Sequence, residues 1–156
     1  MALLGRIFVV IFAVLVASLA AGVAIATGLL GPQWHVFTGD VIERSTFTVM
    51  VFTSAVFTGA VGLLPLAVLI GIAEAFKIRS LLAYAVAGVA VLMIGYYSSG
   101  LAPRSYEDSI DGAPPPVRHE TEVAMAAGVM FGLTYWALAG RNAGRWRERR
   151  QPSGQA

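Results

Sequence analysis

Few side chains in this sequence could carry catalytic chemistry. The chain has no cysteine and two histidines, His35 and His119. The lack of cysteine excludes disulfides, thiolate metal sites and cysteine nucleophiles, and two histidines cannot supply the four ligands of a haem pair. Ser18, Ser54 and Ser80 have no histidine close in sequence, and neither a GxxxxGK loop nor a GxGxxG motif is present. We therefore predict a non-enzymatic protein with no catalytic residue and no cofactor.

Glu74 is the acidic residue with the strongest claim to a function. It ends a long apolar run and is followed by Lys77 and Arg79. An ionisable group inside a membrane is often functional, so Glu74 could couple the movement of a proton or a cation. On a helix it could instead pair with Lys77 as an interfacial ion pair. Its place at the end of the run, where water is accessible, favours the ion pair.

A second polar group surrounds His119. Carboxylates and an imidazole could bind a divalent cation. However, the spacing is not that of an EF-hand, and Pro114, Pro115 and Pro116 favour an extended segment. We predict no metal site here. Glu120 and Glu122 are instead expected at the start of a helix, where they complement its dipole.

The end of the chain is basic. Cationic side chains beside a membrane bind anionic lipid headgroups, and tryptophan favours the same interface. Such a segment anchors the chain at the headgroups or binds a cytoplasmic partner, and it is too small a basic surface for nucleic acid. We expect residues 141–156 to form a disordered cytoplasmic tail. The residues assigned to these contacts are Arg145, Trp146, Arg147, Arg149 and Arg150.

Composition places these residues in a membrane protein. Of the 156 residues, 57% are hydrophobic and only 13% are charged, whereas soluble domains carry about 25% charged residues. About 20 apolar residues span a bilayer as a helix. The first run has 24 residues from Ile7 to Leu30, longer than the apolar part of a signal peptide, so we expect it to stay uncleaved. We predict an all-α bundle of four transmembrane helices, near residues 7–30, 47–73, 81–97 and 123–139, within one domain of residues 1–140.

The charges between these runs predict the orientation. The side that holds both termini has eight basic and two acidic residues, and the other side has three basic and seven acidic residues. Basic residues concentrate on the cytoplasmic side of membrane proteins. Both termini are therefore expected in the cytoplasm of a bacterium, with the protein in its inner membrane.

Small residues indicate where the helices pack. Membrane helices associate through close backbone approach, which small side chains allow. The last helix has Ala124, Gly128 and Gly132 at four-residue spacing, and the second has Ala55 and Gly59. These residues pack the bundle internally or form a dimer seam, and we favour the first alternative.

The second helix also has a polar face. Thr53, Ser54 and Thr58 lie on one side of it, and Pro65 should kink it. These hydroxyl groups could line a cavity or pathway that leads towards Glu74. Alternatively, each hydroxyl bonds a carbonyl of its own helix, which is the commoner arrangement in membranes.

Together these features predict an accessory or assembly subunit in an anionic lipid bilayer. We expect it to associate with itself as a homodimer or with a larger membrane complex. The alternative is a small dimeric transporter or channel that uses the threonine and serine face of the second helix. Liposome flux with the purified protein would separate the two functions.

Overall fold

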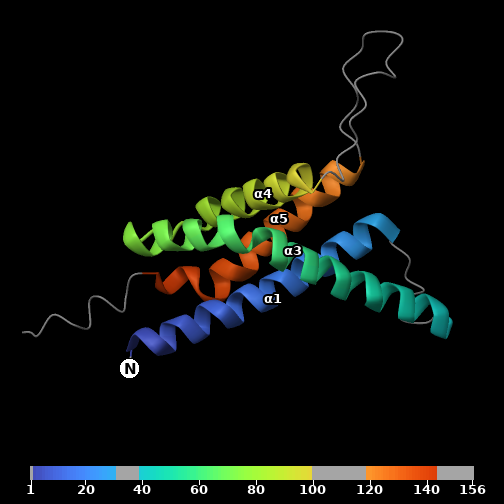
Figure 1. Ribbon diagram of the computed structural model, residues 1–156, viewed down its shortest axis with the longest axis horizontal. Helices are drawn as coiled ribbons and strands as arrows, with labels where there is room; N and C mark the ends of the chain where they lie inside the picture. The colour runs from blue at the N-terminus through green and yellow to red at the C-terminus, as the bar shows by residue number, and fades with distance from the viewer. Residues whose placement is uncertain (1, 31–38, 100–118, 144–156) are drawn as a thin grey trace, which may run out of the picture.

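The computed structural model describes residues 2–30, 39–99 and 119–143, and these ranges are helical (Figure 1). Helix α5 packs against both α1 and α4. Helix α3 crosses α1 and touches α4 much less than it touches α1. The fold is therefore all-α, as expected. Its elements are α1 (Ala2–Leu30), α3 (Val41–Ala75), α4 (Leu81–Ser98), α5 (His119–Leu138) and the 3₁₀ turn η1 (Gly140–Asn142).

Three of the helices are long and apolar enough to cross a membrane. They are Leu4–Leu30 of α1, the whole of α4 and the whole of α5. Their outer sides expose large apolar side chains such as Phe8 at 73% and Leu82 at 72%. Water-soluble monomers rarely expose so much apolar surface. Such a surface is compatible with a membrane protein.

The fourth helix, α3, is bent. Its two halves, Val41–Ala60 and Pro65–Ala75, meet at 64° and together are apolar enough for one broken span. Pro65 lies at the bend, as the sequence suggests, because proline cannot donate to the carbonyl of residue 61 and its ring crowds that carbonyl. The described residues therefore contain three helices that are long and apolar enough to cross a membrane, and one bent helix. We call Val41–Ala60 the α3 arm, because Figure 1 shows it diverging from α4 and α5.

The α3 arm begins six residues before the span predicted at residue 47. The carboxylate of Asp40 accepts a hydrogen bond of 2.6 Å from the N–H of Val41 and caps the helix, and Glu43 complements the dipole in the first turn. Hydropathy marks where a chain enters the apolar layer, and a capped helix can start well before that point.

The other end of α3 has an unusual termination. The N–H of Ile78 donates to the carbonyl of Ala73 at 2.9 Å, and Lys77 has φ of 54°. This is a Schellman termination, in which the left-handed position usually holds glycine. A side chain with a Cβ is strained there. The turn directs the chain from α3 into α4.

Lys77→Gly should raise the free energy of unfolding by about 1 kcal/mol relative to Lys77→Ala, because both remove the long side chain but only glycine relieves the left-handed strain. Equilibrium unfolding of the detergent-solubilised protein, followed by circular dichroism, measures the difference. Equal stabilities of the two variants would contradict the strained geometry.

Helix packing rests on small residues. Ala13, Ala17 and Ala21 of α1 are fully buried in the core, beside Phe131 and Tyr135 of α5. Alanine contributes little apolar area, so these helices gain stability mainly from close approach.

The α1–α3 crossing lies at Gly22 and Ala55. A Cβ added at Gly22 would lie 2.5 Å from the carbonyl oxygen of Val51 and 3.1 Å from the Cβ of Ala55. Gly59 has more room, because a Cβ there would meet only the hydroxyl of Ser18 at 3.7 Å. Of the two predicted packing residues in α3, Ala55 lies at the closest approach and Gly59 does not.

The α4–α5 seam is tighter still. A Cβ at Gly128 would lie 2.6 Å from the Cα of Val89, and one at Gly132 would lie 2.9 Å from the Cα of Ala85. Gly88 faces them from α4, where a Cβ would collide with the carbonyl oxygen of Gly128. Ala124 is also buried. Gly128 and Gly132 of this stripe thus pack against α4 inside one chain.

Candidate functional site

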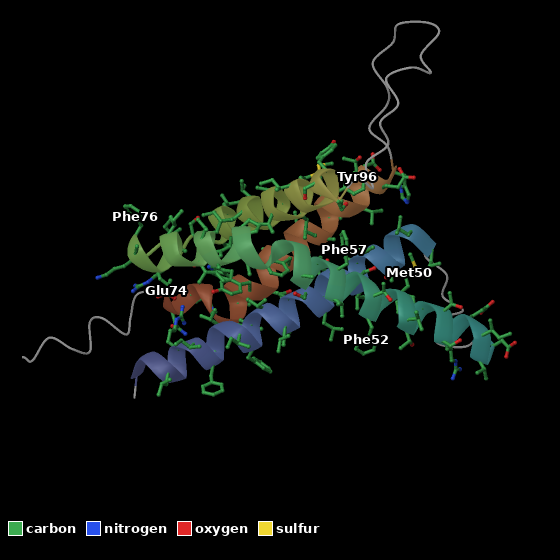
Figure 2. The ribbon with its side chains drawn as sticks, in the orientation of Figure 1. Met50, Phe52, Phe57, Glu74, Phe76 and Tyr96 are labelled. Carbon is green, nitrogen blue, oxygen red and sulfur yellow. The ribbon has the colours of Figure 1, made fainter. Side chains whose placement is uncertain are left out.

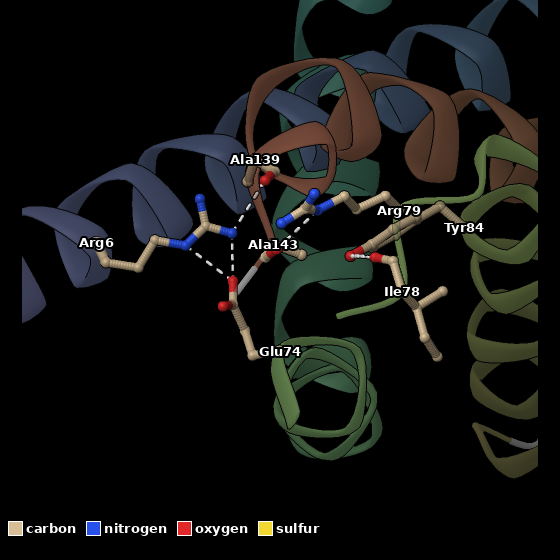
Figure 3. A network of polar contacts seen from close by, with 7 residues as sticks. All are labelled: Arg6, Glu74, Ile78, Arg79, Tyr84, Ala139 and Ala143. Carbon is tan, nitrogen blue, oxygen red and sulfur yellow. Dashed lines mark hydrogen bonds and ion pairs between the residues drawn. The ribbon is translucent and has the colours of Figure 1, made fainter. Parts of the chain in front are cut away.

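Charged side chains from distant parts of the chain meet at one end of the bundle. Arg6 of α1 donates to the Oε1 of Glu74 through Nε at 2.8 Å and also through its terminal nitrogen. The same terminal nitrogen donates to the carbonyl of Ala139 at 3.0 Å (Figure 3). The guanidinium and the carboxylate are 14% and 16% exposed. This ion pair joins α1, α3 and the end of α5.

Three further hydrogen bonds reinforce the same end. Arg79 Nε donates to the carbonyl of Ala143 at 3.1 Å, and Trp136 Nε1 donates to the carbonyl of Arg79 at 2.8 Å. The hydroxyl of Tyr84 donates to the carbonyl of Ile78 at 3.2 Å. The bonds of Arg79 and Trp136 connect the α3–α4 turn with α5 and the residues that follow it, and the bond of Tyr84 ties this turn to α4. We call the contacts of Arg6, Glu74, Arg79 and Trp136 the end clamp.

The end clamp gives Glu74 a structural partner. The pairing expected with Lys77 assumed a helix that continues through both residues, but α3 ends at Ala75 and Lys77 lies in the turn. The structure pairs Glu74 with Arg6, which is 68 residues away in sequence. A part-buried carboxylate that is held by a guanidinium fastens helices together, and breaking such a pair is costly.

A cavity of about 420 Å³ lies on the other side of the bend. The α3 arm and the last turns of α4 form its sides, and α1 and α5 contribute Ile25 and Val123. In Figure 2, Phe57 on α3 and Tyr96 on α4 lie on opposite sides of this opening, which we call the α3–α4 cavity. The predicted polar face lines it with Thr53, Ser54 and Thr58.

Beyond the bend, the lining becomes apolar. A separate cavity of about 160 Å³ is lined by Leu66, Leu69, Val91 and Phe131 among others. Pro65 thus marks the boundary between a cavity lined by threonine and serine and a largely apolar one to which Tyr84 and Tyr135 contribute. The structure does not bring Glu74 to the face of Thr53, Ser54 and Thr58, since Glu74 lies in the end clamp.

Ser18 lies at the boundary between the two cavities. Its side chain is only 6% exposed, and its hydroxyl has no hydrogen-bond partner. It lines a small space of about 10 Å³ together with Thr58 and Gly62. Such a space is close to the minimum for one water molecule.

Ser18→Ala should raise the free energy of unfolding by about 1 kcal/mol, because the variant no longer buries an unpaired hydroxyl. Ser45→Ala is the matched control. The Ser45 hydroxyl is exposed and donates to the carbonyl of Ile42 at 2.8 Å, so its loss should change stability by less than about 0.5 kcal/mol. Thermal unfolding in detergent measures both. A clear loss of stability in Ser18→Ala would contradict this description.

Other hydroxyls of the arm bond their own helix. Thr46 Oγ1 donates to the carbonyl of Ile42 at 2.9 Å, and Thr48 Oγ1 donates to that of Arg44 at 2.8 Å. This is the local arrangement that we considered for the polar face. It allows the arm to lie in lipid without unpaired donors at these positions.

The acidic end of α5 lies far from the end clamp. His119 Nε2 is 2.9 Å from the carbonyl oxygen of Gly28, and His119 Nδ1 is 3.9 Å from Glu122. Among the described residues, no three His, Asp or Glu side chains are grouped to hold a metal ion. Glu120 and Glu122 lie in the first turn of α5, where the sequence places them.

The predicted headgroup contacts fall outside the described residues. Arg145, Trp146, Arg147, Arg149 and Arg150 all belong to the segment 144–156. Within the described part of the chain, Arg141 lies with its guanidinium 5.8 Å from the ring centre of Trp136.

Sequence reasoning missed Arg6, Gly22 and Gly88. Arg6 is the only charged side chain before Asp40, and a single charge near the end of a long apolar helix signals a buried ion pair. Gly88 lies in the middle of an apolar run, where a glycine signals close helix packing.

Comparison of the chain with protein-family models, curated proteins and solved structures finds no match. Its function must therefore be argued from the residues and their geometry.

Proposed function

We propose that this protein is a non-enzymatic membrane protein that acts by association. It serves as an accessory or assembly subunit, and the α3 arm is the surface that binds a second copy or a larger membrane complex. The carrying observation is the divergence of the arm from α4 and α5.

The exposure of the arm supports this proposal. Val49, Phe52 and Val56 are each more than half exposed, at 63%, 59% and 69%. The arm approaches α1 closely at Gly22, while a cavity separates it from much of α4. An apolar helix held at one crossing leaves most of its surface for lipid or for another transmembrane helix.

The end clamp supports the same function. It holds α1, the far half of α3 and α5 together through the part-buried hydrogen bonds of Arg6 and an exposed one from Trp136. One end of the molecule is thus fastened and the arm extends from the other, an arrangement suited to presenting a helix to a partner.

We further propose that α3 is a broken span, which gives four spans with both termini cytoplasmic in a bacterial inner membrane. Arg6, Arg79 and Arg141 lie at one end of the helices, and Glu120 and Glu122 lie at the opposite end. This separation supports the positive-inside orientation. In intact cells, a single cysteine at Leu4 should be protected from an impermeant maleimide. A single cysteine at Ser99 should react with it. Labelling at Leu4 and protection at Ser99 would show the opposite orientation and contradict the proposal.

Mild-detergent extraction of tagged protein, with identification of all co-purifying proteins, tests the association. We expect a stoichiometric complex or homodimer. Replacing both Phe52 and Val56 with Ala should release the partner, whereas the same change at Phe8 and Phe12, exposed on α1, should retain it. Recovery of a bare monomer under conditions that preserve other membrane complexes would contradict the proposal.

A second function, a small dimeric transporter or channel, is favoured by the α3–α4 cavity. Its hydroxyl groups and the bend at Pro65 resemble the broken helices that form substrate sites in transporters. Conduction would require the cavity on the far side of Pro65 to open into a continuous pathway. Liposomes containing the protein should then pass alkali cations. Cation flux equal to that of empty liposomes would exclude this function.

A further inference from the structure

The geometry points to a binding site for an amphipathic cation in the α3–α4 cavity. The ligand is a hydrocarbon chain that bears an ammonium group, with the chain between the helices and the ammonium beside Glu120. This inference concerns a small ligand and does not depend on a protein partner for the arm.

Polarity along the cavity supplies the first argument. Glu120 in the first turn of α5 is exposed and lines the cavity. One turn further along the same helix, the lining changes to Val123 and Ala124, which are 7% and 9% exposed. The carboxylate therefore lies at the mouth and apolar side chains lie deeper.

The neighbouring helices repeat this gradient. On α4 the lining passes from Tyr96 to Leu92 and then Val91, and on α1 it passes from Leu29 to Ile25. An elongated amphiphile fits such a gradient with its polar group at the mouth. A uniformly polar solute would leave the apolar walls uncovered, which costs free energy.

Charge supplies the second argument. Glu120 is the only charged side chain among the described residues that line the cavity. A carboxylate at the mouth of a low-dielectric space attracts a cation and repels an anion. The hydroxyls of Thr53 and Ser54 lie on the α3 side and can accept hydrogen bonds from an ammonium group.

The third argument is the polar group at the deep end. Thr58 and Gly62 line both the cavity and the small space beside Ser18. Ser18 is buried with an unpaired hydroxyl. The site therefore ends near the bend, beyond which the lining is apolar, and the ligand has a defined depth.

Isothermal titration of the full chain in maltoside micelles tests the site, with dodecylamine as the probe and dodecanol as its neutral counterpart. Both compounds partition into micelles, so the difference between their affinities measures the contribution of the Glu120 carboxylate. We expect dodecylamine to bind about five-fold or more tightly than dodecanol, the ratio that one partly desolvated ion pair provides. Equal affinities would overturn the inference.

Two pairs of variants locate the site. Glu120→Gln should remove the preference for the amine, whereas Glu122→Gln, which changes the same helical turn outside the cavity, should keep it. Thr53→Trp should block both probes, whereas Thr48→Trp, also exposed on the arm, should not. A preference that survives Glu120→Gln, or binding that survives Thr53→Trp, would contradict this placement.

Lipid analysis of the protein after mild extraction identifies the source of the ligand. Phosphatidylethanolamine shares the ammonium group, although its phosphate leaves the headgroup without net charge. Its retention by the wild type and loss in Thr53→Trp would assign the site to the ammonium of a membrane lipid. Dodecylamine binding without retained lipid would assign it to a free amphiphilic amine. The absence of both retained lipid and probe binding would refute the inference.

Discussion

Gly132→Ala should lower the free energy of unfolding by about 3 kcal/mol, at the upper end of the cost of overpacking. The added Cβ would lie 2.9 Å from the Cα of Ala85 and closer still to the carbonyl of Tyr84. Those atoms belong to the backbone of α4 and cannot rotate away. The two helices must therefore separate along the seam that contains Gly88 and Gly128.

Gly71→Ala is the matched control for this prediction. It changes a glycine in another apolar helix, where an added Cβ meets no atom within 4 Å. It should leave stability unchanged or raise it by up to about 1 kcal/mol, because alanine favours helices. Equilibrium unfolding in detergent measures both variants. Similar effects of the two substitutions would contradict the close α4–α5 contact.

Glu74→Gln should lower the free energy of unfolding by about 3 kcal/mol, because it leaves the charge of Arg6 buried without its carboxylate. Arg6 is 14% exposed on its side chain. Its remaining bond to the carbonyl of Ala139 does not neutralise the charge. The end of α3 should then detach from α1, and folded protein in the membrane should decrease.

A double variant distinguishes an ion pair from a functional carboxylate. Replacing Arg6 with Met and Glu74 with Leu together should recover stability to within about 1 kcal/mol of the wild type, because neither charge is then left unpaired. Glu43→Gln, an exposed acid in the first turn of α3, serves as the control and should change stability by less than about 1 kcal/mol. If Glu74→Gln is neutral for stability, the end clamp does not hold the helices as described.

The sequence was sufficient to predict the all-α class and the spans of α1, α4 and α5. The length of an apolar run bounded by charges and aromatic residues matches the thickness of the bilayer, so such runs can be identified from sequence. The packing of Gly128 and Gly132 was also predictable, because four-residue spacing of small residues marks one helix face. The helix that these glycines contact was not predictable. The same spacing serves for packing against another helix of the same chain and against a second copy of the protein.

The bond between Glu74 and Arg6 could not be read from local spacing. Sequence spacing points only to Lys77, three residues away, which lies in the left-handed turn after the end of α3. Arg6 reaches Glu74 only through the packing of α1 against α3 and α5. The same reasoning applies to Thr53, whose role in a cavity follows from the divergence of α3 from α4.

Photo-crosslinking from the α3 arm in native membranes tests the proposed association most directly. The chain has no cysteine, so benzophenone-maleimide can be attached at a single position, with Phe52→Cys or Val56→Cys on the arm and Phe12→Cys on α1. Irradiation should produce one discrete larger species, a homodimer or a complex with a second protein, from the arm positions and none from α1. Adducts with lipid alone at every position would contradict the claim that the arm binds a protein partner.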